Sequence, residues 1–569
     1  MEIAKSLEPS RSERSFWPYV AAAAVLVIIL AAIRWSLAHP YGIHWDEDSY
    51  FDEVGIDVQR LLSGHLIKLG GRIFIKGWGV PPAYRILALP FLSLFGFHTT
   101  LARMVSLTCF ALSAWFIYLA ARNIDGKVAG AIAVLIFALA PDVVSASMFF
   151  GTDAPLYLAT SAMLYYLFAF WSEPSERPRN WIGLGAAVGL GFLSKTSFAI
   201  IALPVLAFAL VVRHYKYFGI PSLASQLKAA GLASIIAGPW WLLNVKKALA
   251  YAAYARGFVR NSLGPPSLTT WMHWLNTVVQ CLLGHGLSIF IALVLAAALL
   301  RAIFKRETFL NPLQRTALGA CACAGAPIVL MQLSGTNHLL RHISPAVIPL
   351  AIAIGVLSVQ TGWIGSKIST TIAIALFSAQ LLMIICPVIV PNTHEVHSSF
   401  VNGSPPWQVM ARFDQWDWQP LRDVSDSCGL AAPKISFLGG GPELNPPQLA
   451  YPWVLHGVSV DHAAVARPEV TWLWRYEEGP LDWQKVMNSA EQSDIVFTAP
   501  HLQGEPTYKD DLDNRHNAEF EERLSHDPSF RGPVLMQVGR FQPVQIDIFL
   551  KNTLVCRPGQ QAAAEGKSK

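Results

Sequence analysis

Long apolar runs separated by short polar connections fill the chain from residue 16 to about residue 390. Each run has close to the roughly 20 residues that an α-helix needs to cross the hydrocarbon core of a bilayer. The pattern predicts a polytopic α-helical membrane protein with about 11 transmembrane helices, or 11–13. The predicted spans are residues 16–37, 101–121, 127–143, 153–171, 180–197, 198–212, 223–243, 275–300, 312–333, 342–358 and 364–390.

A polar loop, residues 38–79, and a shorter apolar stretch, residues 81–97, separate the first two spans. The loop contains an acidic run, then an amphipathic stretch at residues 51–62, then a Gly-rich piece with several basic residues. The stretch 81–97 is short and is interrupted by proline, so it is a poor candidate for a span. We expect it to form a helix that lies at the membrane interface.

Lysine and arginine are distributed unevenly over the connections between spans. With residues 1–15 in the cytoplasm, every inner connection carries Lys or Arg, as the positive-inside rule requires. These inner connections are residues 122–127, 173–180, 213–217, 301–315 and 360–367. The outer face then receives residues 38–79, 141–152, 244–274, 334–340 and everything after about residue 391. No small-residue cleavage site follows the first span, which indicates an uncleaved anchor.

The part from residue 391 to residue 569 differs in composition, being rich in proline, tryptophan and charge. Strand-like runs at 434–438, 495–498, 534–538 and 545–550 predict a soluble α/β domain outside the cytoplasm, following a membrane module of residues 16–390. The glycines at 439–441 favour a tight turn over a phosphate loop, because no Lys-Ser/Thr follows. Cys428 and Cys556 could pair if this domain faces an oxidising compartment.

The composition agrees with a membrane location. Of the 569 residues, 53% are hydrophobic and 14% are charged, and the mean hydropathy is +0.38. Soluble globular chains contain about 25% charged residues. The net charge of +5 is too small to indicate a nucleic-acid partner.

Three consecutive carboxylates, Asp46, Glu47 and Asp48, follow the first predicted span. Acids at the mouth of a membrane helix are costly unless water, cations or a charged substrate meet them. One of them could act as a general base on an acceptor hydroxyl group. Together with His44, Asp46 and Glu47 could hold a divalent metal ion. The alternatives are a solvated acidic loop and a histidine that caps an interface helix.

A fourth carboxylate, Asp153, begins a later predicted span on the same outer face. Its alternative role is to cap that helix, and both roles suit one residue. Basic residues also gather at outer helix ends, where they could bind phosphate. They could instead extend toward lipid headgroups. These cations are Lys195, Arg256, Arg260 and Arg341.

These motifs together resemble the polyprenol-dependent membrane glycosyltransferases of the GT-C fold, and most closely the protein O-mannosyltransferase and lipid A aminoarabinose transferase group. The resemblance covers about residues 16–360. Its matching pieces are Asp46, Glu47 and Tyr50; Trp78, Pro81 and Pro82; Leu94, Phe95 and Gly96; Ala102 and Arg103; Asp153; residues 191–195 with Leu203 and Pro204; Pro239, Trp240 and Trp241; and Arg341, Pro345 and Pro349.

The resemblance implies transfer of a sugar from a polyprenyl-phosphate donor to a lipid, glycan or protein hydroxyl on the outer face, with inversion at the anomeric carbon. Asp46 would be the general base, Glu47 its partner and Asp153 the second-loop acid. The implied substrate-binding residues are Asp48, Tyr50, Lys76, Arg85, Lys195, Arg256, Arg260 and Arg341. A divalent metal ion is an open possibility within this group. The extra acid, Asp48, leaves open which carboxylate acts.

Two other classes of protein stay open at this stage. A transporter or flippase for a lipid-linked anionic substrate would place ionisable residues near mid-span and break helices in paired halves. Here the ionisable residues lie mostly at the outer ends of the predicted spans, which favours the transferase. An assembly protein would tolerate loss of Asp46. The chain is compact and has one Asn-x-Ser/Thr sequon, at residues 402–404, so we expect a bacterial inner membrane, with the endoplasmic reticulum as alternative.

Overall fold

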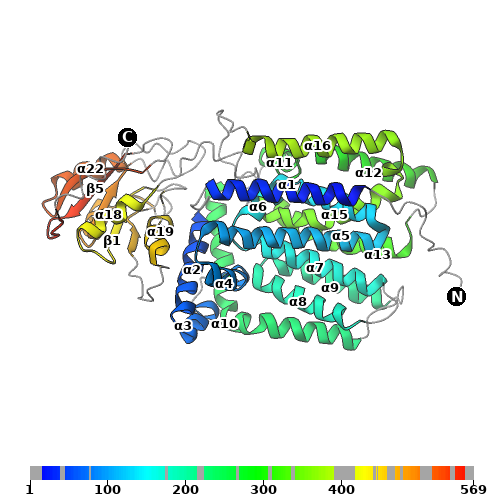
Figure 1. Ribbon diagram of the computed structural model, residues 1–569, viewed down its shortest axis with the longest axis horizontal. Helices are drawn as coiled ribbons and strands as arrows, with labels where there is room; N and C mark the ends of the chain where they lie inside the picture. The colour runs from blue at the N-terminus through cyan, green and yellow to red at the C-terminus, as the bar shows by residue number, and fades with distance from the viewer. Residues whose placement is uncertain are drawn as a thin grey trace.

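The computed structural model combines a bundle of long helices with a smaller domain at one end of it (Figure 1). The structure describes residues 16–38, 45–75, 79–172, 177–214, 223–263, 268–305, 310–334, 340–389, 417–439, 444, 446–457, 468–474, 479–499, 516–538 and 545–557. All structural statements below concern these residues.

The helices of the bundle run side by side along the long axis of the molecule (Figure 1). They are α1 (Trp17–Ala38), α5 (Thr99–Ala138), α7 (Asp153–Ser172), α8 (Pro178–Ser194), α9 (Phe198–His214), α10 (Leu223–Leu263), α12 (His285–Lys305), α13 (Pro312–Ser334), α15 (Val347–Gln360) and α16 (Lys367–Ile389). Shorter elements join them at the ends. These are α6 (Pro141–Met148), α11 (Leu268–Thr277), the π-helix η2 (Val278–Leu283), α14 (Leu340–Ile343) and the 3₁₀ turns η3 (Ser344–Ala346) and η4 (Trp363–Gly365).

Helix α5 is long enough to cross a membrane twice. Its backbone leaves the helical conformation at Asp125 and Gly126. Gly126 has a φ of +83°, a conformation that glycine adopts without the steric cost other residues pay. The break coincides with the predicted connection 122–127 between two spans. In the described part of the chain seven helices are long and apolar enough to span a bilayer, with α5 counted once. The count of eleven spans stays a prediction.

The core of the bundle is formed by α5, α7 and α15, with α1 and α13 packed around them. Gly355 allows α15 to approach α5 closely, because a Cβ atom there would lie 2.5 Å from the Ala129 carbonyl oxygen. Small residues permit such close helix contacts in membranes. On the exterior, α12 and α16 expose large apolar side chains such as Phe304 and Ile368. An exterior of this kind suits lipid, so the protein is an integral, multi-pass membrane protein.

Helices α2 (Trp45–Leu62), α3 (Leu66–Phe74) and α4 (Ala83–Phe95) lie at the end of the bundle nearest the smaller domain (Figure 1). The expected amphipathic stretch therefore begins earlier than residue 51 and includes the acidic run. The expected interface helix 81–97 corresponds to α4. An apolar cluster that includes Phe51, Val58 and Tyr84 joins α2 to α4.

The smaller domain contains a five-stranded sheet in the order β2-β1-β3-β5-β4. Its strands are β1 (Lys434–Phe437), β2 (Glu469–Trp472), β3 (Ile495–Thr498), β4 (Phe530–Gln537) and β5 (Gln545–Lys551). Its helices are α18 (Gln419–Ser427), α19 (Pro446–Gly457), α20 (Trp483–Ala490) and α22 (Asn517–His526). β1 pairs in parallel with β2 and β3, whereas β5 runs antiparallel to β3 and β4. An α/β domain is therefore present where the sequence predicted one, and β2 is a strand that the sequence did not predict.

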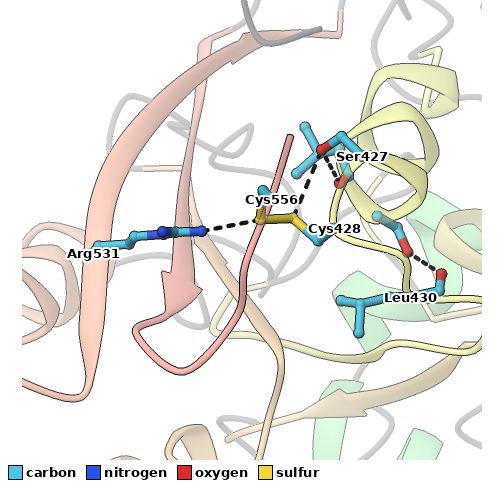
Figure 2. Close-up of a disulfide and its surroundings, with 7 residues drawn as sticks. Ser427, Cys428, Leu430, Arg531 and Cys556 are labelled. Carbon is cyan, nitrogen blue, oxygen red and sulfur yellow. Dashed lines mark hydrogen bonds between the residues drawn. A yellow bond between two sulfur atoms is a disulfide. The ribbon is translucent and has the colours of Figure 1, made fainter. Parts of the chain in front are cut away.

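A disulfide between Cys428 and Cys556 joins the end of α18 to the segment after β5 (Figure 2). Arg531, on β4, donates a hydrogen bond from Nη2 to the Cys556 sulfur at 3.0 Å (Figure 2). The pairing that the sequence allowed is therefore present in the structure.

The smaller domain packs on the membrane module through α19. The Tyr451 ring lies 6.4 Å from the Phe51 ring on α2, and both side chains are buried. The helix that carries the acidic run is thus held between the bundle and the smaller domain (Figure 1). We refer to the end of the bundle that carries Asp46 and Asp153 as the acidic end.

Candidate active site at the acidic end of the helix bundle

Asp46 and Arg341 form an ion pair between the first turn of α2 and α14. Arg341 Nη2 donates to Asp46 Oδ2 at 2.5 Å, although the two residues are 295 positions apart in the chain. Both side chains are partly exposed, 32% for Asp46 and 19% for Arg341. The N-terminal turn of a helix carries partial positive charge, which also favours a carboxylate at Asp46. The pair is therefore an accessible, charged feature of the acidic end.

A second ion pair joins Asp153, in the first turn of α7, to Lys195, directly after α8. Lys195 Nζ donates to Asp153 Oδ1 at 2.5 Å. Asp153 is 2% exposed and Lys195 is 17% exposed, so this pair lies deeper than the first. Arg341 lies within electrostatic range of both Asp46 and Asp153. The structure thus brings together four of the predicted site residues.

Tyr50 lies one turn after Asp46 on α2 and belongs to the same group of charges. Burial, and then the nearby negative charge of Asp46, raises the pKa of its hydroxyl well above the ordinary value. Arg341 acts in the opposite direction and Asp153 in the same direction as Asp46. Tyr50 is therefore a neutral hydroxyl group that can donate a hydrogen bond beside the two ion pairs.

Glu47 faces the interior of the protein. Its oxygens accept hydrogen bonds from Arg103 Nε at 3.0 Å and Arg103 Nη2 at 2.8 Å, and both side chains are 0% exposed. The Phe150 backbone N–H donates to Glu47 Oε1 at 2.8 Å. The Arg103 guanidinium also lies against the rings of Trp35 and Phe51. These contacts join α1, α2, α5 and the segment after α6, and they favour a structural role for Glu47.

The three adjacent acids of α2 differ in their access to a substrate. Glu47 and Asp48 are 0% and 1% exposed, whereas Asp46 is 32% exposed. A general base must reach the hydroxyl group that it deprotonates. Access therefore favours Asp46 over its two neighbours, a choice that the sequence left open.

Arg85 lies away from the two ion pairs, in the contact between α2 and α4. Its guanidinium makes two hydrogen bonds to Asp57, from Nε at 2.6 Å and from Nη2 at 2.8 Å. Arg72 on α3 also donates to Asp57, and Tyr84 donates to Glu53 nearby. Arg85 is 3% exposed. Its predicted contact with a lipid phosphate stays a prediction, and its present partners hold α2 and α4 together.

Several predicted residues lie outside what the structure describes. His44 and Lys76 fall in segments that are not described, and α10 is described through Arg256 and Arg260 without their side chains. Within the described residues no group of three His, Cys, Asp or Glu side chains is arranged to hold a metal ion. Asp46 and Glu47 are each paired with an arginine, and the third predicted ligand, His44, is not described, so the metal site stays a prediction.

Asp142 is a further carboxylate of the acidic end, and it was not among the predicted site residues. It lies in the first turn of α6 and is 1% exposed. Burial raises the pKa of Asp142 to about 7, and the nearby Asp153 acts in the same direction. The available signal in the sequence was a carboxylate after Pro141 in the predicted outer connection 141–152.

The two ion pairs suit the binding of an anion followed by proton transfer. Phosphate oxygens compete well for arginine and lysine, because charge-assisted hydrogen bonds to them are strong. A phosphate that bound Arg341 or Lys195 would leave the partner carboxylate without its cation. A carboxylate released in this way is a stronger base than one held in an ion pair.

Comparisons with known proteins agree with a membrane transferase fold. A family model described as dolichyl-phosphate-mannose-protein mannosyltransferase matches residues 79–242, which is less than half of the chain. A search of curated protein sequences finds no match. The comparison with solved structures therefore covers more of the chain than the family model does.

Three solved structures are similar to the chain over most of its length. ArnT from Cupriavidus metallidurans, bound to undecaprenyl phosphate, has a TM-score of 0.55 and 13% identity, over 94% of this chain and 97% of that chain. The archaeal oligosaccharyltransferase AglB from Archaeoglobus fulgidus, in complex with an inhibitory peptide and a dolichol-phosphate, has a TM-score of 0.51 and 14% identity, over 90% and 72%.

The third structure is the arabinofuranosyltransferase AftD from Mycobacteria, with a TM-score of 0.53 and 12% identity, over 94% of this chain and 40% of that chain. All three are GT-C fold glycosyltransferases. The chain therefore has the GT-C fold, and the expected resemblance is confirmed at the level of the fold.

Proposed function

We propose that this protein is a membrane glycosyltransferase that moves a sugar from a polyprenyl phosphate to a hydroxyl group of a glycan, lipid or protein. The observation that carries the proposal is the pair Asp46–Arg341 beside the pair Asp153–Lys195 at one end of the bundle. The family match to a dolichyl-phosphate-mannose-dependent transferase supports it. So does the similarity to ArnT, which was solved with undecaprenyl phosphate.

The proposed reaction is a single displacement at the anomeric carbon. The acceptor oxygen forms a bond to that carbon while the bond from the carbon to the phosphate oxygen breaks. The electron pair of the broken bond remains on the phosphate, and the acceptor proton passes to Asp46. Attack from the face opposite the phosphate inverts the anomeric configuration. Cations beside the phosphate stabilise the charge that develops on it.

Arg341 has two partners in this proposal, one before and one after the donor binds. In the free protein it neutralises Asp46, which keeps that carboxylate a weak base. The donor phosphate then takes over the guanidinium through paired hydrogen bonds. Asp46 becomes a stronger base at the moment when a sugar is present, so proton transfer follows donor binding. Lys195 and Asp153 form a second ion pair of an acid and a base, which is more buried than the pair of Asp46 and Arg341.

The acidic end is placed outside the cytoplasm in this proposal. The predicted basic connections lie at the opposite end of the spans, as the positive-inside rule requires. The disulfide between Cys428 and Cys556 belongs to a domain on the side of the acidic end, and disulfides persist in oxidising compartments. We assign the protein to a bacterial inner membrane, with the smaller domain in the periplasm.

Mass spectrometry of a deletion strain tests the proposal. The strain is complemented with wild-type protein, with Asp46→Asn, or with Asp426→Asn, which alters an exposed carboxylate of the smaller domain. Wild type and Asp426→Asn should each restore a glycan, lipid or protein modification that the deletion strain lacks. The strain that expresses Asp46→Asn should instead accumulate the polyprenyl-linked sugar that serves as the donor. Restoration by Asp46→Asn would overturn the proposal. If deletion moved the lipid-linked sugar from one face of the membrane to the other, and no modified product were lost, the protein would be a flippase.

A further inference from the structure

The Tyr50 side chain has a hydroxyl group that no described residue uses. The side chain is half-buried, and its hydroxyl makes no hydrogen bond with any residue that the structure describes. Tyr50 follows Asp46 by four positions, so the two side chains lie on the same face of α2, about one turn apart. A hydroxyl group in this place can donate its proton to a ligand of the proposed site.

The Tyr50 ring is packed between α4 and the segment that joins α6 to α7. The centroid of the Tyr84 ring, on α4, lies 4.6 Å from the centroid of the Tyr50 ring. The Phe149 ring lies 6.1 Å away and is nearly perpendicular to it. The ring therefore connects the turn of α2 that carries Asp46 to the segment that leads to Asp153.

Gly151 makes this packing possible because it has no side chain. A Cβ atom at position 151 would lie 2.8 Å from Tyr50 Cε2 and 2.8 Å from Phe149 Cε1. Carbon atoms that are not bonded to each other pack at about 3.5–4.0 Å, so even an alanine would force one of the rings to move. The φ angle of Gly151 lies outside the left-handed region. Space for the rings, and not backbone conformation, is therefore what requires a glycine here.

Tyr84 is itself held in place by α2. It is 1% exposed, and its hydroxyl donates a hydrogen bond to Glu53 Oε2. Glu53 lies one turn after Tyr50 on α2 and also faces Arg85 Nη1 at 3.8 Å. The ring that packs against Tyr50 is thus fixed through its own hydroxyl group.

The charges nearby indicate which ligand the Tyr50 hydroxyl would meet. Asp46 and Asp153 accept hydrogen bonds from Arg341 and Lys195, the two cations of the acidic end. A ligand that binds these cations brings negative oxygen atoms to the same group of side chains. A hydroxyl group makes a stronger hydrogen bond to a charged phosphate oxygen than to a neutral sugar hydroxyl. The chemistry therefore favours a phosphate oxygen.

We propose that Gly151 and Tyr84 are positioning residues that hold the Tyr50 ring in place, so that its hydroxyl donates a hydrogen bond to the phosphate of the donor lipid. Gly151 acts by leaving room for the ring. Tyr84 acts by packing against the ring while its own hydroxyl is bonded to Glu53. The inference rests on the proposed function, because it takes a polyprenyl phosphate as the ligand.

The first test measures the dissociation constant of undecaprenyl phosphate for the purified full-length protein. Tyr50→Phe keeps the ring and removes only the hydroxyl group. It should weaken binding about tenfold, the size expected for a hydrogen bond to a charged group. Undecaprenyl phosphate carries no sugar, so a wild-type dissociation constant in Tyr50→Phe would overturn the assignment of the phosphate as the ligand.

A double-mutant cycle tests whether Gly151 acts through Tyr50. Gly151→Ala should weaken binding about fivefold, because the displaced ring moves its hydroxyl away from the phosphate. In the Tyr50→Phe background the same change should cost less than about twofold, since no hydroxyl remains to be displaced. Tyr84→Phe removes only the bond to Glu53 and should show the same pattern with a smaller loss. Equal losses in both backgrounds would mean that these residues only stabilise the fold, and would overturn the proposal.

Gly319→Ala is the matched control, because it also crowds an aromatic ring. A Cβ atom at position 319 would lie 2.6 Å from the Phe208 ring. Gly319 lies near the start of α13, at the opposite end of that helix from α14. This variant should bind undecaprenyl phosphate like wild type. A loss equal to that of Gly151→Ala would mean that crowding anywhere in the bundle weakens binding, and would overturn the role of Gly151.

A measurement without ligand separates this proposal from the proposed function. 3-Fluorotyrosine is incorporated at position 50, and its fluorine resonance is followed by NMR. Gly151→Ala should shift this resonance, whereas Gly319→Ala should leave it unchanged. An unchanged resonance in Gly151→Ala would overturn the positioning role. A shifted resonance in a protein that binds no undecaprenyl phosphate would support the packing around Tyr50 and overturn the proposed function, together with the phosphate ligand that rests on it.

Discussion

Replacing Glu47 by glutamine separates a structural role from a catalytic one. The substitution keeps the size of the side chain and one acceptor for the Phe150 N–H, but it removes the charge that faces Arg103. Because both members of this pair are 0% exposed, the arginine would be left as a buried charge without its carboxylate. Breaking a buried ion pair in this way costs about 3–5 kcal/mol.

The adjacent residue provides the matched comparison. Asp46→Asn breaks an ion pair whose members are 32% and 19% exposed, so its cost should stay below about 1 kcal/mol. We expect Glu47→Gln to lower the apparent melting temperature in detergent by several degrees and to reduce the amount of protein in the membrane. Asp46→Asn should melt close to wild type while losing sugar transfer.

A double-mutant cycle with Arg103 tests the cause of the loss. Glu47→Gln combined with Arg103→Gln removes both charges, so the double variant should be more stable than the sum of the two single losses predicts. The reasoning would be refuted by a Glu47→Gln protein that melts like wild type and has no transfer activity. Glu47 would then act in the chemistry, as the sequence resemblance implied.

Three further predictions concern the second ion pair, the smaller domain and the topology. Lys195→Met should weaken undecaprenyl phosphate binding in an equilibrium assay more than Asp153→Asn does, since only the first removes a cation; equal losses would contradict this. Cys428→Ser should cost the smaller domain about 4–5 kcal/mol, because the Cys428–Cys556 disulfide closes a loop of about 128 residues, and a melting curve unaffected by reductant would argue against the bridge. A phosphatase reporter fused after Lys569 should be active outside the cytoplasm, whereas a cytoplasmic signal would separate the smaller domain from the proposed site.

The long apolar runs of the sequence were sufficient to locate most of the helices. The predicted spans 153–171 and 312–333 correspond to α7 and α13 with small changes at their ends. Runs of this length have few alternatives in a bilayer, where each backbone group must be bonded within its own helix. The strand β2 was missed because it has four residues and an alternating, half-exposed pattern at the edge of the sheet.

The sequence also predicted which charged residues lie at the same end of the bundle, but it did not predict which of them form ion pairs. Asp46, Asp153, Lys195 and Arg341 were placed on one face by counting spans and basic connections. Which cation meets which acid depends on how distant helices pack, as in the contact between Arg341 and Asp46 across 295 positions. The residues that surround Asp46 and Arg341 in the sequence do not predict that contact.

Glu47 and Asp142 also show that the surroundings of a side chain are hard to predict from the sequence. Glu47 resembles a catalytic acid in the sequence because it follows Asp46, but helix geometry turns adjacent side chains by about 100° and directs it to Arg103. Asp142 is isolated in the sequence, and its burial at the acidic end follows from the packing of α6. Burial and partners are tertiary properties, so the surroundings of neither residue could be predicted from residue order.

The transfer reaction itself is the most direct test of the central claim. Wild-type protein and Asp46→Asn are reconstituted in liposomes with polyprenyl-linked sugars and acceptors extracted from membranes of the source organism. Mass spectrometry then follows the donor lipid and the free polyprenyl phosphate over time. Wild type should convert the donor to polyprenyl phosphate and a glycosylated product, and Asp46→Asn should leave the donor intact while still binding undecaprenyl phosphate. Equal conversion by both proteins would contradict the assignment of Asp46 as the base.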